Sequence, residues 1–233
     1  MTIRPASDRS LLVSFGSGIS LESHHQVFHL TRSLEGIRGI LNLHPAYASL
    51  LIEFDPRLVE SAVIEGLIHR KMAAEAEKHD GEAARTVEIP VHYGGEFGPD
   101  LDDVAKHTGL SPERVVELHS SADYLVYFLG FAPGFAYLGG LPPELTTPRI
   151  SAPRKHVPAG SVAIGGNQTG VYPIVSPGGW RLIGRTSVKL FDPRAEEPVL
   201  LRMGDQLRFV AENLVGRTPW SAADPPVGLQ GIA

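Results

Sequence analysis

The sequence predicts an α+β protein of two domains, a small α/β domain of the split βαβ or ferredoxin-like kind and then a β-barrel or sandwich. In the first third, short continuous apolar runs, which are typical of strands, alternate with segments whose apolar residues recur at helical spacing. A polar stretch, 78–83, then marks a boundary. Beyond it, many short apolar runs are separated by Gly and Pro, of which the chain has 25 and 19. We expect domains at 1–84 and 85–219, with a loosely ordered tail at 220–233.

The first domain is expected to begin with a strand and a helix. The strand, Ser10–Phe15, places Leu-Leu-Val between polar ends and is closed by Gly16. Ser20 is a suitable N-cap for the helix, and Ser23 is the competing residue. Apolar residues then recur at helical spacing until Gly36, which stops the helix.

Two strands, a second helix and a last strand complete the predicted first domain. The strands are Gly39–His44 and Ser49–Phe54. Asp55-Pro56 offers an N-cap with Pro at the first helical position, and an apolar face then runs from Leu58 to Met72. Arg85–Val91 is the candidate for the last strand, so the order becomes strand, helix, strand, strand, helix, strand. Because it follows the boundary stretch, this strand could belong to either domain.

The second domain is expected to start with two short helices. The first, Leu101–Thr108, ends at Gly109, and the second begins at Ser111-Pro112 with an N-cap and a Pro at N1. Tyr124–Leu129 is a strongly apolar strand. Further short strands are expected at Ser161–Gly165, Val171–Val175, Trp180–Arg185, Val188–Phe191 and Leu207–Phe209.

Composition narrows the class of protein. The chain of 233 residues has a net charge of −5, so a general nucleic-acid or acidic-membrane surface is not expected. It has no cysteine, which excludes disulfides, thiolate metal sites and a cysteine nucleophile. The start, MTIRPASDRS, is too polar for a signal peptide, and no apolar run approaches the ~20 residues that span a bilayer. We therefore expect a cytoplasmic protein.

Several common catalytic motifs are absent. The chain has no G-x-x-x-x-G-K-[ST] for ATP, no G-x-S-x-G nucleophile turn and no H-E-x-x-H zinc helix. His25 and His29 have a spacing that can hold a metal, but no third ligand is evident, so no metal is predicted. Gly165-Gly166-Asn167 and Gly178-Gly179 have backbone N–H groups that can bind an anion, although Gly pairs are commoner in hairpin turns.

One stretch, Phe128–Arg185, organises the second domain. Its Gly and Pro alternate with large apolar residues such as Phe135, Tyr172 and Trp180, which a flexible linker lacks. Such a pattern predicts tight turns between short buried strands. Polar side chains lie inside these turns. Either the domain is an all-β structure with polar turns, or the turns form the wall of a pocket.

Ordered motifs in this stretch carry a family resemblance. They are Gly130-Phe131-Ala132-Pro133-Gly134-Phe135, Tyr137-Leu138-Gly139, Thr147-Pro148-Arg149, Pro153-Arg154, Val157-Pro158-Ala159-Gly160-Ser161, Gln168-Thr169-Gly170-Val171-Tyr172-Pro173, Pro177-Gly178-Gly179-Trp180 and Leu182-Ile183-Gly184-Arg185-Thr186. The resemblance extends through Ile89-Pro90-Val91, Tyr93-Gly94-Gly95, Leu190-Phe191-Asp192-Pro193 and Gly204-Asp205. The chain resembles the family that contains the B subunit of 5-oxoprolinase, allophanate hydrolase subunit 1 and the KipI-type inhibitors of a sporulation histidine kinase. The resemblance implies a ferredoxin-like first domain and a cyclophilin-like β-barrel as the second.

The polar residues that match these motifs form the candidate site: Arg149, Arg154, His156, Gln168, Thr169, Tyr172 and Arg185. A lactam needs a donor to its carbonyl and an acceptor for its N–H, and Gln168 has both. A carboxylate on the same molecule needs a guanidinium fork, which Arg154 and Arg149 supply. His156 is the one group in the set that titrates near neutrality, so His156 and Gln168 are the catalytic candidates. For each arginine alone, a surface salt bridge is the simpler interpretation.

Three functions compete. The resemblance is greatest to the B subunit of 5-oxoprolinase, which implies ATP-dependent opening of 5-oxo-L-proline to L-glutamate together with the A and C subunits of that enzyme. The C subunit would carry a second barrel of the same type, and ATP would not be bound by a motif in this chain alone. The alternatives are an allophanate- or urea-processing amide hydrolase component and a non-catalytic inhibitor of a histidine kinase.

Overall fold

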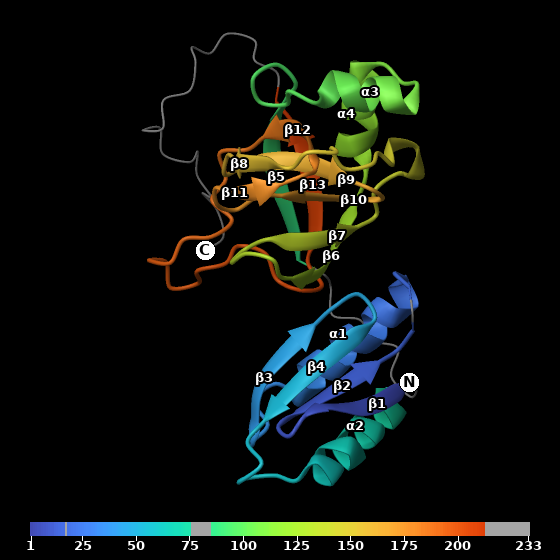
Figure 1. Cartoon of the computed structure of the whole chain (residues 1–233), viewed down its shortest axis with the longest axis vertical. Coiled ribbons are helices and arrows are strands. Elements are labelled where there is room, and N and C mark those ends of the chain that lie inside the picture. Colours follow the sequence, from blue (N-terminus) through green and yellow to red (C-terminus); the bar gives the residue numbers. More distant parts are fainter. Residues whose placement is uncertain (17, 76–84, 213–233) are drawn as a thin grey trace. The chain divides into compact units, whose positions relative to one another are not determined.

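The structure is a computed structural model that describes residues 1–16, 18–75 and 85–212. The chain divides into two compact units, with the division between Ala84 and Arg85 (Figure 1). The polar stretch at 78–83 and the tail at 220–233 lie outside the described residues. None of the described helices is long and apolar enough to cross a membrane.

The first unit is an antiparallel sheet with two helices. Its elements are β1 (Thr2–Ser7), β2 (Ser10–Ser14), α1 (Leu21–Leu34), β3 (Ile40–Pro45), β4 (Ser49–Phe54) and α2 (Ser61–Glu75). The strands lie in the order β1-β2-β4-β3, with antiparallel neighbours throughout. Alternate residues of β2 and β4, such as Leu11 and Ile52, share one core with Leu30 of α1 and Ile64 of α2. The two helices therefore cover the apolar face of the sheet.

The boundaries of α1 agree with the sequence prediction. Ser20 is the N-cap, and its hydroxyl oxygen accepts a hydrogen bond from the Ser23 N–H at 3.1 Å. The helix ends at Leu34, and Gly36 has a φ of +72°, which suits glycine because it has no Cβ to clash.

The ferredoxin-like order predicted for this unit is not confirmed. Its edge is formed by β1, whose residues are mostly exposed and therefore show no apolar alternation in the sequence. The strand expected at Arg85–Val91, which could belong to either domain, lies in the second unit as Thr86–Tyr93. The predicted start of α2 at Asp55-Pro56 is also wrong. The Asp55 carboxylate accepts hydrogen bonds from the Arg57 backbone and side chain in a turn, and α2 begins only at Ser61.

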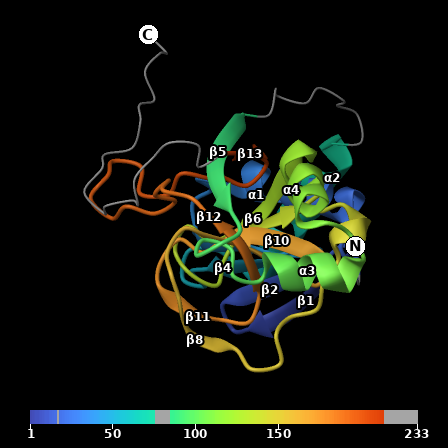
Figure 2. The ribbon, with the colours of Figure 1, turned by 90° about the horizontal axis from the view of Figure 1, so that it is seen from above.

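The second unit is a closed barrel with helices beside it, as Figure 2 shows from above. Its elements are β5 (Thr86–Tyr93), α3 (Leu101–Thr108), α4 (Pro112–Ser121), β6 (Tyr124–Leu129), β7 (Ala136–Gly139), the 3₁₀ helix η1 (Pro143–Leu145), β8 (Arg154–Val157), β9 (Ser161–Gly165), β10 (Gln168–Val171), β11 (Ser176–Gly178), β12 (Arg181–Arg185) and β13 (Gln206–Ala211). The barrel order is β10-β7-β6-β13-β5-β12-β9, and β11 and β8 form a separate ribbon. Only β13 and β5 pair in parallel among these strands. The closed barrel fits the cyclophilin-like expectation.

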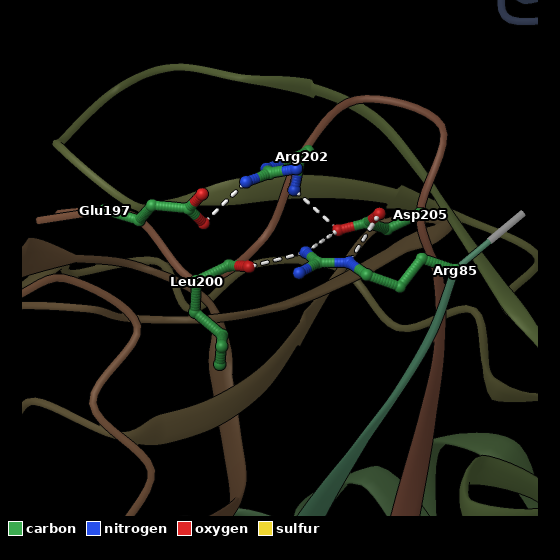
Figure 3. A network of polar contacts seen from close by, with 5 residues as sticks. All are labelled: Arg85, Glu197, Leu200, Arg202 and Asp205. Atoms are coloured by element: carbon green, nitrogen blue, oxygen red, sulfur yellow. Dashed lines mark hydrogen bonds and ion pairs between the residues drawn. The ribbon is translucent and has the colours of Figure 1, made fainter. Parts of the chain in front are cut away.

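The pair of β5 and β13 is fixed at its start by a buried carboxylate (Figure 3). Asp205 is almost fully buried and accepts from Arg85 Nε at 3.1 Å, from Arg85 Nη2 and from the Arg202 backbone N–H at 2.7 Å. Arg85 Nη2 also donates to the Leu200 carbonyl oxygen at 2.7 Å. A bidentate contact of this kind fixes geometry as well as adding stability. The Gly204-Asp205 motif therefore has a structural role.

The structure corrects three of the predicted strands. The predicted Val171–Val175 is replaced by Gln168–Val171, and Val188–Phe191 is not a strand apart from one bridge at Phe191. The predicted Trp180–Arg185 begins one residue later, at Arg181. The short strands β7, β8 and β11 were not predicted, because β8 and β11 are largely exposed and β7 has only four residues.

Candidate functional site

The outer wall of the barrel carries a second apolar cluster. Along β9, Val162 and Ile164 belong to the core that fills the barrel, and side chains alternate along a strand, so Ala163 points outward. Ala163 packs in what we call the outer cluster, which consists of Phe135, Val157, Ala163, Tyr172, Trp180 and Leu182. The ribbon of β8 and β11 and the turns around it contribute residues to this cluster.

Glycines let the rings of the outer cluster lie directly against backbone. A Cβ on Gly165 would lie 2.5 Å from the Trp180 ring, and a Cβ on Gly178 would lie 2.4 Å from the Tyr172 hydroxyl oxygen. Real side chains do not tolerate such distances. These two glycines are therefore required by the close approach of aromatic rings, and the region around them is packed.

Gln168 lies on the same face as Trp180. It pairs directly with Gly165 across β10 and β9, and a Cβ added to Gly165 would point at the indole of Trp180. Directly opposite residues of a strand pair share a face. Gln168 Nε2 is buried and has no hydrogen-bond partner among the described residues. An amide in this state retains a donor for a ligand.

Arg154 is held beside the outer cluster by a buried carboxylate that the sequence did not predict. Arg154 Nη2 donates to Asp100 Oδ1 at 2.7 Å, and Asp100 Oδ2 accepts from the Leu182 N–H at 2.7 Å. The Asp100 side chain is 7% exposed and that of Arg154 31%. Arg154 Nη1 is buried without a partner among the described residues. One nitrogen of the guanidinium is thus committed to structure, and another can still donate.

Arg149 and Tyr172 complete this part of the site. Arg149 is exposed, and its guanidinium carbon lies 5.8 Å from the centre of the Trp180 ring. Burial raises the pKa of the Tyr172 phenol above 10.0, although a backbone hydrogen bond at Trp180 and the charges of Arg149 and Arg154 act in the lowering direction. Tyr172 therefore stays protonated near neutral pH.

Arg185 lies in a polar row across three neighbouring strands. It is directly opposite His92 of β5 on one side and Ser161 of β9 on the other. Its guanidinium carbon lies 5.7 Å from the centre of the Phe97 ring. Arg185 Nε, His92 Nδ1 and Ser161 Oγ are all buried without a partner among the described residues. Of this row, only Arg185 was among the predicted site residues.

Thr169 and His156 are not brought to the outer cluster. Thr169 is fully buried, and its hydroxyl donates to the Ala163 carbonyl oxygen at 3.0 Å. It accepts at 2.8 Å from His119 Nε2, and His119 Nδ1 lies 2.8 Å from the Tyr93 hydroxyl. Because Thr169 uses its proton on Ala163, His119 carries its proton on Nε2, and Tyr93 donates to Nδ1. Thr169 thus belongs to an interior chain of hydrogen bonds, whereas His156 is exposed on β8.

The described residues contain no group of three or more His, Asp or Glu placed to hold a metal. Of the histidines on α1, His24 is buried, and burial together with the charge of His25 lowers its pKa to about 4. His29 Nε2 lies 3.3 Å from the Lys71 carbonyl oxygen. His24 and His29 therefore pack within the first unit, whereas His25 is exposed.

Known proteins resemble the chain over most of its length. The family described as carboxyltransferase domain, subdomain C and D, matches residues 1–201. The B subunit of 5-oxoprolinase from Escherichia coli O157:H7 is 49% identical over 195 residues, which cover 83% of this chain and 88% of the relative. The B subunit of 5-oxoprolinase from Bacillus subtilis is 42% identical over 221 residues, covering 89% and 91%.

Solved structures and distant relatives extend the comparison. The crystal structure of TTHA0988 is 42% identical with a TM-score of 0.78, and the match covers 91% of this chain but only 41% of that longer chain. Urea amidolyase from Lachancea kluyveri is 24% identical, and the match covers 13% of its length. The urea carboxylase structure from Kluyveromyces lactis, at 22% identity and a TM-score of 0.70, shares the fold.

Proposed function

The chain belongs to the carboxyltransferase-domain family of subdomains C and D, and we propose that it is the B subunit of an ATP-dependent 5-oxoprolinase. The complex would open 5-oxo-L-proline to L-glutamate, with A and C subunits as the partners of this chain. The observation that carries the proposal is the 49% identity to the B subunit of a 5-oxoprolinase, which covers 83% of this chain and 88% of that protein.

The reaction needs ATP because a five-membered lactam is a resonance-stabilised amide and a poor electrophile. Transfer of the γ-phosphoryl group to the lactam carbonyl oxygen, with release of ADP, makes the carbonyl carbon attackable by water. Water adds to that carbon, and the C–N bond breaks as the nitrogen takes up a proton, which leaves an acyl phosphate of glutamate. A second water then hydrolyses the acyl phosphate to glutamate and inorganic phosphate. Donors placed around the carbonyl oxygen stabilise the charge that develops there. This chain would supply such donors, and ATP would be bound with the help of a partner chain.

We assign the roles from the contacts of the outer wall. Gln168 Nε2, which has no partner among the described residues, would donate to the lactam carbonyl oxygen, while its amide oxygen accepts from the lactam N–H. Arg154 Nη1 and Arg149 would bind the substrate carboxylate. Tyr172 and Arg185 would add donors. His156, exposed on β8, would act as an acid or base only if substrate reaches that face of the ribbon.

A urea- or allophanate-processing component is the second candidate, because urea amidolyase is a distant relative at 24% identity. Its substrate is also a small amide, so the same donors would serve. Assay of the assembled complex separates the two. ATP-dependent release of glutamate from 5-oxoproline supports the first, whereas turnover of allophanate or urea without glutamate release supports the second.

The experiment that tests the proposal is reconstitution. The chain is purified alone and together with co-expressed candidate A and C subunits, and glutamate release from 5-oxoproline is measured with and without ATP. We expect turnover only with the complex and ATP. Turnover by the isolated chain contradicts the assignment to a multi-chain enzyme, and no turnover by a well-formed complex contradicts the substrate. A complex with the C subunit is expected to bury more than ~1,200 Å², so it should co-elute at micromolar concentration.

A further inference from the structure

A strained backbone presents an exposed aromatic ring beside the outer cluster. Phe131 has a φ of +64° and is the only non-glycine residue with a positive φ in the described part of the chain. The Ala132 N–H donates to the Gly130 carbonyl oxygen at 2.7 Å, which closes a γ-turn around Phe131. A γ-turn with positive φ is rare and strained, and for a bulky residue this conformation is a true outlier.

The strain is imposed by a closed loop. The Gly130 N–H donates to the Phe135 carbonyl oxygen at 3.0 Å, and the Phe135 N–H donates to the Ala132 carbonyl oxygen at 3.0 Å. Gly134, at a φ of +81°, lies so close to the neighbouring chain that a Cβ there would be 2.9 Å from the Leu190 carbonyl oxygen. The turn is therefore held on both sides, and Phe131 has little freedom to relax.

Core packing does not explain why the strain is kept. The Phe131 residue is 62% exposed, whereas Phe135 in the same loop is 3% exposed. The ring makes edge-on contacts with Phe135 at 5.5 Å and with Tyr172 at 6.5 Å between ring centres. These contacts fix the direction of the ring and leave much of it open to solvent. Backbone strain held in this way is common at ligand sites, where it fixes a side chain in one position.

The neighbours of the Phe131 ring indicate which class of ligand would pack against it. Tyr172, which Phe131 touches edge-on, has its hydroxyl against Gly178, the residue that pairs with Arg154 across β11 and β8. Arg149 lies over the Trp180 ring of the same outer cluster. A flat apolar ring next to cationic donors suits a small planar molecule that carries an acidic group. Resting on the proposed function, we propose that the Phe131 ring is an aromatic wall of the substrate site, against which the planar lactam of 5-oxo-L-proline packs while its carboxylate faces the arginines.

The test compares Phe131→Gly with Phe131→Tyr in the reconstituted complex. Phe131→Gly removes the ring but suits the positive φ, so the melting temperature should stay unchanged or rise. The KM for 5-oxoproline should rise about tenfold with little change in kcat, because a packing contact made in both ground and transition states is lost. Phe131→Tyr should keep KM within about twofold, and the KM for ATP should not move in either variant. Val210→Ala, which shortens another exposed apolar side chain, is the matched control.

Three results would count against the aromatic wall. A KM for 5-oxoproline that is unchanged in Phe131→Gly, with an active wild-type complex, overturns the inference alone. Loss of co-elution with the partner chains in Phe131→Gly makes the ring an interface anchor and also overturns it. A wild-type complex that forms but releases no glutamate overturns the proposed function, and the aromatic wall with it.

Discussion

Removing the Asp100 carboxylate should destabilise the barrel far more than removing its neighbour Asp103. Both carboxylates pair with an arginine, at 2.7 Å for Asp100 with Arg154 and at 2.8 Å for Asp103 with Arg181. They differ in burial, since the Asp100 side chain is 7% exposed and that of Asp103 61%. Asp100 also precedes α3 at the N-cap position without capping it, because its second oxygen accepts from the Leu182 N–H.

The magnitude follows from the groups left behind in Asp100→Ala. The buried Leu182 N–H loses its acceptor, which costs about 1–3 kcal/mol. The ion pair adds about 1 kcal/mol, because Arg154 is one-third exposed and solvent screens it. We expect a total loss of about 2–4 kcal/mol in the free energy of unfolding for Asp100→Ala. Asp103→Ala breaks an exposed pair and should cost less than about 1 kcal/mol.

The assay is urea denaturation followed by tryptophan fluorescence, since Trp180 is buried in this unit. Arg154→Ala should itself cost about 1–2 kcal/mol by leaving the Asp100 carboxylate with one partner. Equal losses for Asp100→Ala and Asp103→Ala would refute the reasoning, because the burial of Asp100 would then have no consequence.

Three further predictions concern packing and pH. Trp180→Ala should lower the free energy of unfolding by about 3–5 kcal/mol in the same urea assay, because it leaves a cavity in the outer cluster; a loss below about 1 kcal/mol would contradict that packing. Gly165→Ala should destabilise the barrel in thermal melts, since its Cβ would lie 2.5 Å from the Trp180 ring, whereas Gly166→Ala, with nothing near its Cβ but a φ of +68°, should show only backbone strain. Burial lowers the pKa of His119 from 6.5 to about 3, so the neutral form is favoured by folding. The contribution of His119 to the free energy of unfolding is fully present above pH 6.5. It should fall by up to about 1.4 kcal/mol per pH unit as the pH drops toward 3. The slope measured in His119→Gln should be smaller, and an unchanged slope would contradict the assignment.

The elements that the sequence predicts well are those whose signals are local. Tyr124–Leu129 and Ser161–Gly165 are strands as predicted, because continuous apolar runs of this length fit strands buried on both faces. The helix Leu101–Thr108 ends as predicted, because Gly109 adopts the left-handed conformation that stops it. The strand β1 was not predicted, because its residues are mostly exposed and it therefore shows no apolar alternation in the sequence.

The candidate site depends on strand phase and on distant contacts, which the sequence alone does not define. Gln168 and Thr169 are adjacent, yet Gln168 lies on the outer wall and Thr169 inside the barrel. The predicted strand began at Val171, three residues after the true start of β10, so the sequence did not show which face of the strand each side chain occupies. Asp100 and Arg154 are 54 residues apart, and no local pattern connects them. The positive φ of Phe131 was also not evident, because phenylalanine does not mark such a turn as glycine would.

Gln168, the outer-wall residue that we assign to the lactam amide, is the residue on which the proposed chemistry depends most. The most direct measurement is kcat/KM for ATP-dependent glutamate release by the reconstituted complex with Gln168→Ala, alongside its melting temperature. We predict a fall of about a hundredfold or more, from the loss of ~2–4 kcal/mol of transition-state stabilisation, with an unchanged melting temperature. A near-normal kcat/KM would place the reaction elsewhere, and unfolding of the variant would make Gln168 a structural residue.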